Sequence, residues 1–225
     1  MSVFWKLFLR EVNDLGVNSF GLVVFTSIFV GAVTAIQMYN NFSTATIPIP
    51  TYFVGYATKA VLVLEFSPTI ISLILAGKVG SYIASSIGTM RVTEQIDALD
   101  IMGVNSPNFL IMPKILACII YNPLLIALSM AVGIGGGFAA GLLTSNWTIS
   151  EFTTGVQMYM PMLFYYYAFI KTIVFAFIIA TVPSYFGYNV SGGSLEVGRS
   201  STQAVVWTMI FIIISELILT QMILG

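Results

Sequence analysis

The chain has 225 residues, of which 58% are hydrophobic and only 8% are charged. A soluble domain needs roughly a quarter of its residues charged to cover its surface, so this composition excludes a soluble globular fold and indicates an integral membrane protein. The sequence has no histidine and a single cysteine, Cys118, which excludes imidazole catalysis, histidine-ligated metal and disulfide or paired-thiolate sites within the chain. The net charge of −1 gives no reason to expect a nucleic-acid partner.

The segment 1–16 predicts an amphipathic helix that lies in the membrane interface. Its apolar residues recur at helical spacing while its charged residues occupy other directions. The apolar residues are Phe4, Leu7, Phe8, Val12 and Leu15, and the charged ones are Lys6, Arg10, Glu11 and Asp14. The alternative is that this segment is the frayed start of the first span.

Five stretches are long and apolar enough to cross the membrane as helices, since about 20 apolar residues cross roughly 30 Å of hydrocarbon. The expected spans are 19–39, 52–87, 109–144, 156–185 and 203–224. The polar, proline-containing segment 40–50 is expected to be a loop. The sequence therefore predicts an all-α integral membrane protein with one transmembrane domain over residues 1–225.

The most polar stretch of the chain lies between the second and third spans and predicts a short helix outside the bilayer at 88–103. Thr89 is the expected N-cap and Gly103 the expected C-terminal stop. One face is apolar and the other acidic: Val92, Ile96 and Leu99 on the first, Glu94, Asp97 and Asp100 on the second, with Arg91 one turn before Glu94. This pattern favours insertion into a groove on another protein over a solvated surface helix.

The basic residues predict the orientation of the chain. With five spans and the N-terminus inside, six of them fall at or near the cytoplasmic face and only Lys59 lies near the other. The six are Lys6, Arg10, Lys78, Arg91, Lys114 and Arg199. The 88–103 helix and the segment 187–202 are therefore expected in the cytoplasm, with the C-terminus on the periplasmic side.

The segment 187–202 is expected to be a glycine-rich cytoplasmic loop that lets the fifth helix begin near Ser200. Residues 193–200 are one substitution away from the phosphate-loop pattern GxxxxGK[ST]. That pattern binds nucleotide only between a strand and a helix of a soluble α/β domain, and the short interval between two spans has no room for one. We therefore interpret it as a turn.

Three ionisable residues, Lys59, Glu65 and Lys171, fall within the predicted spans, and Lys78 and Glu216 lie nearer span ends. An unpaired charge at mid-bilayer costs about 2.5–3.5 kcal/mol, so such groups usually face a bundle interior, a partner or water. They mark a candidate pathway, in which Glu65 and Lys171 are a candidate interhelical pair. The alternative is that they snorkel or only stabilise the fold.

Gly133, Gly137 and Gly141 repeat every fourth residue in the third span. This spacing places them on one side of the helix, where backbones can approach closely in lipid. Packing within the chain is the favoured interpretation, and a dimer seam is the alternative.

Two segments carry a resemblance to the MlaE/YrbE family of permeases, the membrane subunits of MCE-associated ABC transporters that move phospholipid in Gram-negative bacteria. The first comprises EFSPT at 65–69, AGKVG at 76–80 and GTMRVTEQIDAL at 88–99; the second spans 187–206, with GG at 192–193, VGR at 197–199 and TQAVV at 202–206. Two departures are Lys78, where the family commonly has arginine, and a shorter N-terminal helix.

The resemblance implies a homodimer in the bacterial inner membrane, each subunit having an interfacial helix and five spans. The 88–103 region would be a coupling helix in a cleft of a cytoplasmic ABC ATPase, with contacts from Thr89, Arg91, Glu94, Gln95 and Asp97. The permease would have no catalytic site and bind no cofactor directly, since ATP and Mg would act in the ATPase. A periplasmic MCE-domain protein and an STAS-like accessory protein are further implied partners.

The implied activity is phospholipid movement between the inner and outer membranes, which maintains outer-membrane lipid asymmetry. Candidate residues along the lipid pathway are Lys59, Glu65 and Lys171, with Lys59 the candidate cation for the phosphate. The competing hypothesis is a stand-alone channel or ion-coupled secondary transporter, in which Glu65, Lys171 and Glu216 would form a relay. Dependence of transport on an ATPase distinguishes the two.

Overall fold

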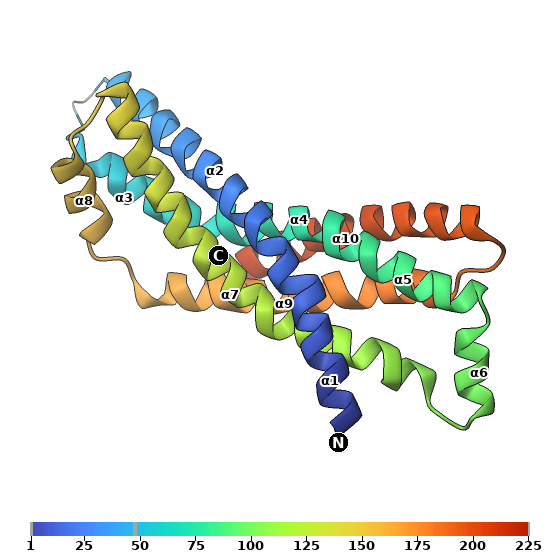
Figure 1. Ribbon diagram of the computed structural model, residues 1–225. Coiled ribbons are helices and arrows are strands. Elements are labelled where there is room, and N and C mark those ends of the chain that lie inside the picture. The colour runs from blue at the N-terminus through green and yellow to red at the C-terminus, as the bar shows by residue number, and fades with distance from the viewer. Residues whose placement is uncertain (1, 47–48, 225) are drawn as a thin grey trace. The chain divides into compact units, whose positions relative to one another are not determined.

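The computed structural model describes residues 2–46 and 49–224, and every regular element in these ranges is a helix (Figure 1). Five continuous helical segments are long and apolar enough to cross a membrane. They are Phe4–Ser43, Tyr52–Val92, Ser106–Thr144, Met162–Tyr188 and Ser194–Leu224. The predicted all-α architecture with five long apolar helices is confirmed.

The first two spans contain π-helical segments. The first runs through α1 (Ser2–Glu11), η1 (Val12–Val17) and α2 (Asn18–Ser43); the second through α3 (Tyr52–Val61), η2 (Leu62–Ile70), α4 (Ile71–Leu75), η3 (Ala76–Gly80) and α5 (Ser81–Val92). Pro68 lies inside η2, where a wider turn relieves the clash of its ring with a preceding carbonyl. The predicted 1–16 helix continues without a break into the first span, and its position in the interface stays a prediction.

The polar helix between the second and third spans is shorter than the predicted 88–103. The second span continues to Val92, and α6 (Gln95–Ile101) follows after a turn. The prediction that Thr89 is an N-cap is wrong, because Thr89 lies inside α5 and its hydroxyl donates to the carbonyl of Ser85 (2.8 Å).

Gly103 ends α6 as predicted. Its φ is +74°, which favours glycine because a Cβ is strained in the left-handed region. The amide of Gly103 donates to the carbonyl of Asp100 and that of Val104 to the carbonyl of Leu99, both at 3.0 Å. These are the two hydrogen bonds of a Schellman motif, after which α7 (Ser106–Thr144) begins.

The predicted start of the fourth span at 156 is wrong. A separate helix, α8 (Ile149–Gln157), comes first, and α9 (Met162–Tyr188) begins five residues later. A capping box starts α8: the Thr148 side chain accepts from the amide of Glu151 (3.2 Å), and the Glu151 carboxylate accepts from the amide of Thr148 (2.9 Å). Pro161 then disfavours helical backbone at the residue before it.

The loop predicted at 187–202 is confined to residues 189–193, because α10 (Ser194–Leu224) begins earlier than the predicted Ser200. The polar first turns of α10 form hydrogen bonds with neighbouring helices. The Ser200 hydroxyl donates to the carbonyl of Phe186 (2.8 Å) and the Ser201 hydroxyl to that of Ser81 (3.1 Å). Hydropathy located the apolar part of the helix and missed this polar extension.

The chain divides into two compact units. Unit 1 comprises Met1–Ser19, Ser72–Leu124 and Lys171–Gly225, and unit 2 comprises Phe20–Ile71 and Leu125–Ile170. The core of unit 2 includes a cluster of Ala35, Val54, Ala140, Trp147 and Phe152. Buried side chains of unit 1 include Leu75, Ile83, Ile87, Ile96 and Phe175. A single functional domain over residues 1–225 stays a prediction.

Glycines bring helix backbones close together inside unit 2. A Cβ on Gly31 would lie 1.8 Å from the carbonyl oxygen of Gly133, and one on Gly136 would lie 2.1 Å from that of Ile28. A Cβ on the other predicted glycines would meet side chains of the same unit: Phe152 at 2.6 Å from a Cβ on Gly137, and Trp147 at 2.4 Å from one on Gly141. Gly31 and Gly136 fall outside the four-residue repeat, so the sequence pattern missed them.

Candidate functional site

The helix α6 connects α5 to α7 (Figure 1). One side of α6 is buried and the other is exposed. Ile96 is 0% exposed, and Val92 and Leu99 are half-buried. Glu94, Gln95, Asp97 and Asp100 are exposed. The apolar stripe anchors the helix to unit 1, and the polar face is therefore accessible to another molecule.

The structure joins two of the five predicted coupling residues directly. The Arg91 guanidinium lies 2.6 Å from the Asp97 carboxylate and 5.8 Å from the centre of the Tyr188 ring. Gln95 donates to the Thr93 hydroxyl (3.0 Å). Glu94 has a φ of 60°, a left-handed conformation that is strained for a residue with a Cβ. The turn before α6 is therefore held in one shape by contacts on both sides of it.

Lys59 is buried and binds the end of α8. Its ammonium group donates to the carbonyls of Val156 (2.8 Å) and Met158 (2.6 Å), and Lys59 is only 6% exposed. The last carbonyls of a helix have no partner inside the helix and attract cations. Thr51, the N-cap of α3, also donates to Glu151 (2.5 Å), so α8 is bonded both to α3 and to the residue that precedes it.

The other charged residues of the spans contact groups of their own units. In unit 1, the Lys171 ammonium lies 2.5 Å from the Glu216 carboxylate, and Lys171 is completely buried. In unit 2, the Tyr167 hydroxyl donates to Glu65 (3.4 Å). The predicted pairing of Glu65 with Lys171 stays a prediction.

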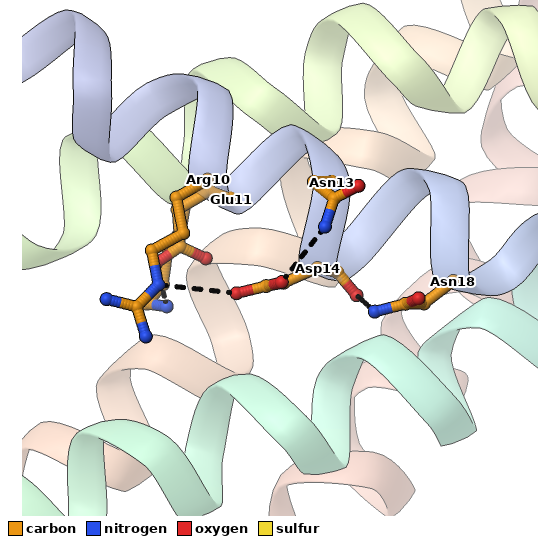
Figure 2. Close-up of polar contacts among 6 residues, drawn as sticks. Arg10, Glu11, Asn13, Asp14 and Asn18 are labelled. Carbon is orange, nitrogen blue, oxygen red and sulfur yellow. Dashed lines mark hydrogen bonds and ion pairs between the residues drawn. The ribbon is translucent and has the colours of Figure 1, made fainter.

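Unit 1 contains a buried ion pair that no sequence pattern predicted. The Lys114 ammonium lies 2.6 Å from the Glu11 carboxylate, and their side chains are 5% and 17% exposed. Glu11 belongs to the polar cluster of the N-terminal segment (Figure 2). These residues are 103 positions apart, and no local periodicity could connect them. In the part of the chain that the structure describes, no three acidic, cysteine or histidine side chains gather to bind a metal.

Comparison with known proteins gives the family of the chain. The model of the family described as Permease MlaE matches residues 8–222. A probable ABC transporter permease protein of Rickettsia bellii is 35% identical over 98% of this chain and 84% of its own length. The intermembrane phospholipid transport system permease protein MlaE of Haemophilus influenzae is 27% identical, with the same shares of the two chains covered.

Five long apolar helices define the chain as a multi-pass membrane protein. The match over nearly the whole sequence then specifies which kind: the chain belongs to the MlaE permease family.

Proposed function

We propose that this chain is the membrane-spanning subunit of an ABC transporter that moves phospholipid between the inner and outer membranes and so maintains outer-membrane lipid asymmetry. Membership of the permease family and the name of the Haemophilus influenzae relative support the substrate class. The observation that carries the proposal is α6, whose apolar side is buried while its acidic side is exposed between two spans. ATP and Mg act in a partner ATPase, and this chain supplies no catalytic residues.

In this proposal α6 is the coupling helix. Thr89, Arg91, Glu94, Gln95 and Asp97 form or support its contact with the ATPase. The Arg91–Asp97 ion pair and the Schellman end at Gly103 make the segment stiff, so movement of the ATPase is transmitted to α5 and α7 rather than absorbed. ATP binding and hydrolysis then shift the population between two arrangements of the spans.

The remaining partners follow from the same proposal. Two copies form a homodimer, in which exposed apolar side chains of α10, including Trp207, Phe211 and Leu217, are candidates for the contact between copies. A periplasmic MCE-domain protein exchanges lipid with the dimer, and an STAS-like protein accompanies the ATPase. The lipid pathway includes Lys59, Glu65 and Lys171, and the Gly133, Gly137 and Gly141 series keeps its helices close.

The test is purification of the tagged full-length protein from its native membranes in mild detergent, followed by mass spectrometry of the chains that co-purify. We expect a stoichiometric ATPase with the wild type and its loss with the double variant Glu94→Lys/Asp97→Lys. Glu196→Lys is the matched control, because Glu196 is an exposed acid of unit 1 outside α6, and it should retain the ATPase.

Phospholipid exchange between vesicles containing the purified complex is the second measurement. Exchange should require ATP and fall to background in the double variant. A protein that purifies without any ATPase and still moves an ion or lipid would contradict the proposal. It would favour the ion-coupled transporter instead, with the buried Lys171–Glu216 pair and Glu65 as its relay.

A further inference from the structure

Unit 1 contains a groove beside the N-terminal segment, made of two pockets of about 360 and 300 Å³ that share Asp14 and Tyr82. The larger pocket is also lined by Asn18, Ser19 and Lys78. The smaller is also lined by Arg10, Glu11 and Lys114. We call this the N-terminal groove. None of its polar residues belongs to the proposed coupling contact except Gln95 at its edge.

Two π-helical segments line the larger pocket. Asp14 and Leu15 come from η1, and Lys78 and Val79 come from η3. A π-turn is rare, and it is frequent at functional sites because it redirects side chains and backbone groups that an α-helix would keep in register. Both spans therefore depart from α-helical geometry at the same pocket.

The charges of the groove leave one cation without a carboxylate. Arg10 lies 3.6 Å from Asp14, which also accepts from the Asn13 amide, as Figure 2 shows. Lys114 is paired with Glu11. The Lys78 ammonium donates to the main-chain carbonyl of Asn18, and within the described ranges it forms no ion pair. Lys78 is thus available to bind an anionic oxygen such as that of a phosphate.

The depth of Lys78 matches the level of lipid phosphates. It lies roughly six residues, or roughly 9 Å, from the middle of the second span, Tyr52–Val92, and the hydrocarbon ends roughly 15 Å from the bilayer centre. A lysine side chain extends its ammonium group the remaining distance to the interface. Asp14 and Asn18 lie in the first half of the continuous helical segment Phe4–Ser43, and the Asn18 carbonyl accepts a hydrogen bond from Lys78.

The surface beside the groove is suited to lipid rather than to free phosphate. On α1, Phe4, Trp5 and Leu9 are exposed, and aromatic and aliphatic side chains of such a helix contact the upper part of acyl chains. The geometry points to a second lipid site: the N-terminal groove binds the phosphodiester headgroup of a phospholipid of the adjacent leaflet, with Lys78 contacting the phosphate. This inference needs only the membrane placement of the chain and does not depend on ATP-driven transport.

The experiment is native mass spectrometry of the full-length protein in detergent, titrated with dioleoylphosphatidylglycerol and without nucleotide. We expect Lys78→Met to weaken retention of one lipid roughly tenfold to a hundredfold, the usual effect of losing a charge-assisted hydrogen bond. Lys78→Arg should restore it. Lys6→Met is the matched control, since Lys6 lies on α1 outside the groove, and it should bind like the wild type.

Two further ligands identify the part of the lipid that is recognised. Dioleoylglycerol has the same chains without the phosphate and should not bind at this site, and inorganic phosphate should not compete with the phospholipid. Equal binding by Lys78→Met and the wild type would overturn the inference. Competition by inorganic phosphate would also overturn it and would define a free-anion site instead.

A second measurement does not require removal of Lys78. In a Tyr82→Cys variant, phosphatidylglycerol should slow maleimide labelling of the new thiol, because Tyr82 lines both pockets. Labelling of Met102→Cys, which is exposed at the end of α6 and lines neither pocket, should not change. The native Cys118 is buried and adds little background. Equal labelling of residue 82 with and without lipid contradicts the site.

Discussion

Three lysines, Lys59, Lys114 and Lys171, are buried in this protein, and each ammonium group contacts oxygen. A buried charge without a partner is too costly to persist. The Lys59 ammonium group donates to carbonyls at a helix end, whereas those of Lys114 and Lys171 contact carboxylates. The sequence identified Lys59 and Lys171 as charges needing a partner, but which atoms they contact depends on segments distant in the chain.

Glu151 gives a prediction at the scale of one residue. Its carboxylate accepts hydrogen bonds from the side chain of Thr51 and from the amide and side chain of Thr148, and these hold its pKa below the ordinary value of 4.5. A carboxylate with a lowered folded-state pKa stabilises the fold above its unfolded pKa. That contribution is lost as the pH falls from about 4.5 through the lower folded-state value.

We therefore expect Glu151→Gln to lower the melting temperature in detergent at pH 7, with the gap to the wild type narrowing below about pH 4.5. Melting curves from pH 7 to pH 3.5 measure this gap. Glu196→Gln is the control, because the ion pair of Glu196 with Arg199 is exposed and such pairs contribute little. A gap that stays constant over the whole range would refute the role given to these hydrogen bonds.

Close approach of helices depends on individual glycines. In α7, Gly135 and Gly136 are neighbours, yet a Cβ on Gly136 would meet the carbonyl of Ile28 whereas one on Gly135 would meet nothing within 4 Å. Backbone atoms cannot rotate away as a side chain can, so α2 and α7 would have to separate. The two adjacent positions therefore differ in what they tolerate although the sequence gives them the same residue.

We expect Gly136→Ala to destabilise the protein by about 1–3 kcal/mol, the usual cost of overpacking. Gly135→Ala should be neutral or stabilise by up to about 1 kcal/mol, because alanine is the better helix former. Thermal unfolding of the two variants in the same detergent measures the difference. Equal effects of the two substitutions would show that α2 and α7 are not packed as the structure has them.

At the scale of the whole molecule, the basic residues are distributed unequally between the two units. Unit 1 contains seven of the eight basic residues and unit 2 only Lys59. The positive-inside rule places the excess of basic residues near the cytoplasm, so the span ends of unit 1 that lie near Arg10, Arg91 and Arg199 are expected there.

Labelling from one side of the membrane tests this orientation. A membrane-impermeant maleimide added to spheroplasts should modify Ser145→Cys, in an exposed turn of unit 2, without permeabilisation. Met102→Cys, exposed at the end of α6, should react only after the membrane is opened. The reverse order of reactivity would invert the topology and exclude contact of α6 with a cytoplasmic ATPase.

The sequence by itself determined the membrane class, the number of long apolar helices, the position of the polar segment before the third span, and the glycine that ends α6. These features depend on composition, on hydropathy summed over about 20 residues and on local backbone preference. Residues that are neighbours in the sequence therefore suffice to predict them. The resemblance carried by residues 65–99 and 187–206 also indicated the family that the comparison confirmed.

Only the tertiary structure decided where several helices begin and end and which distant groups meet. The polar start of α10 is helical because Ser200 and Ser201 bond to other helices, and α8 is separate because Thr148 and Glu151 cap it. The Glu11–Lys114 pair and the π-helical walls of the N-terminal groove join segments far apart in the chain. Such contacts depend on three-dimensional proximity, which no local pattern of residues encodes.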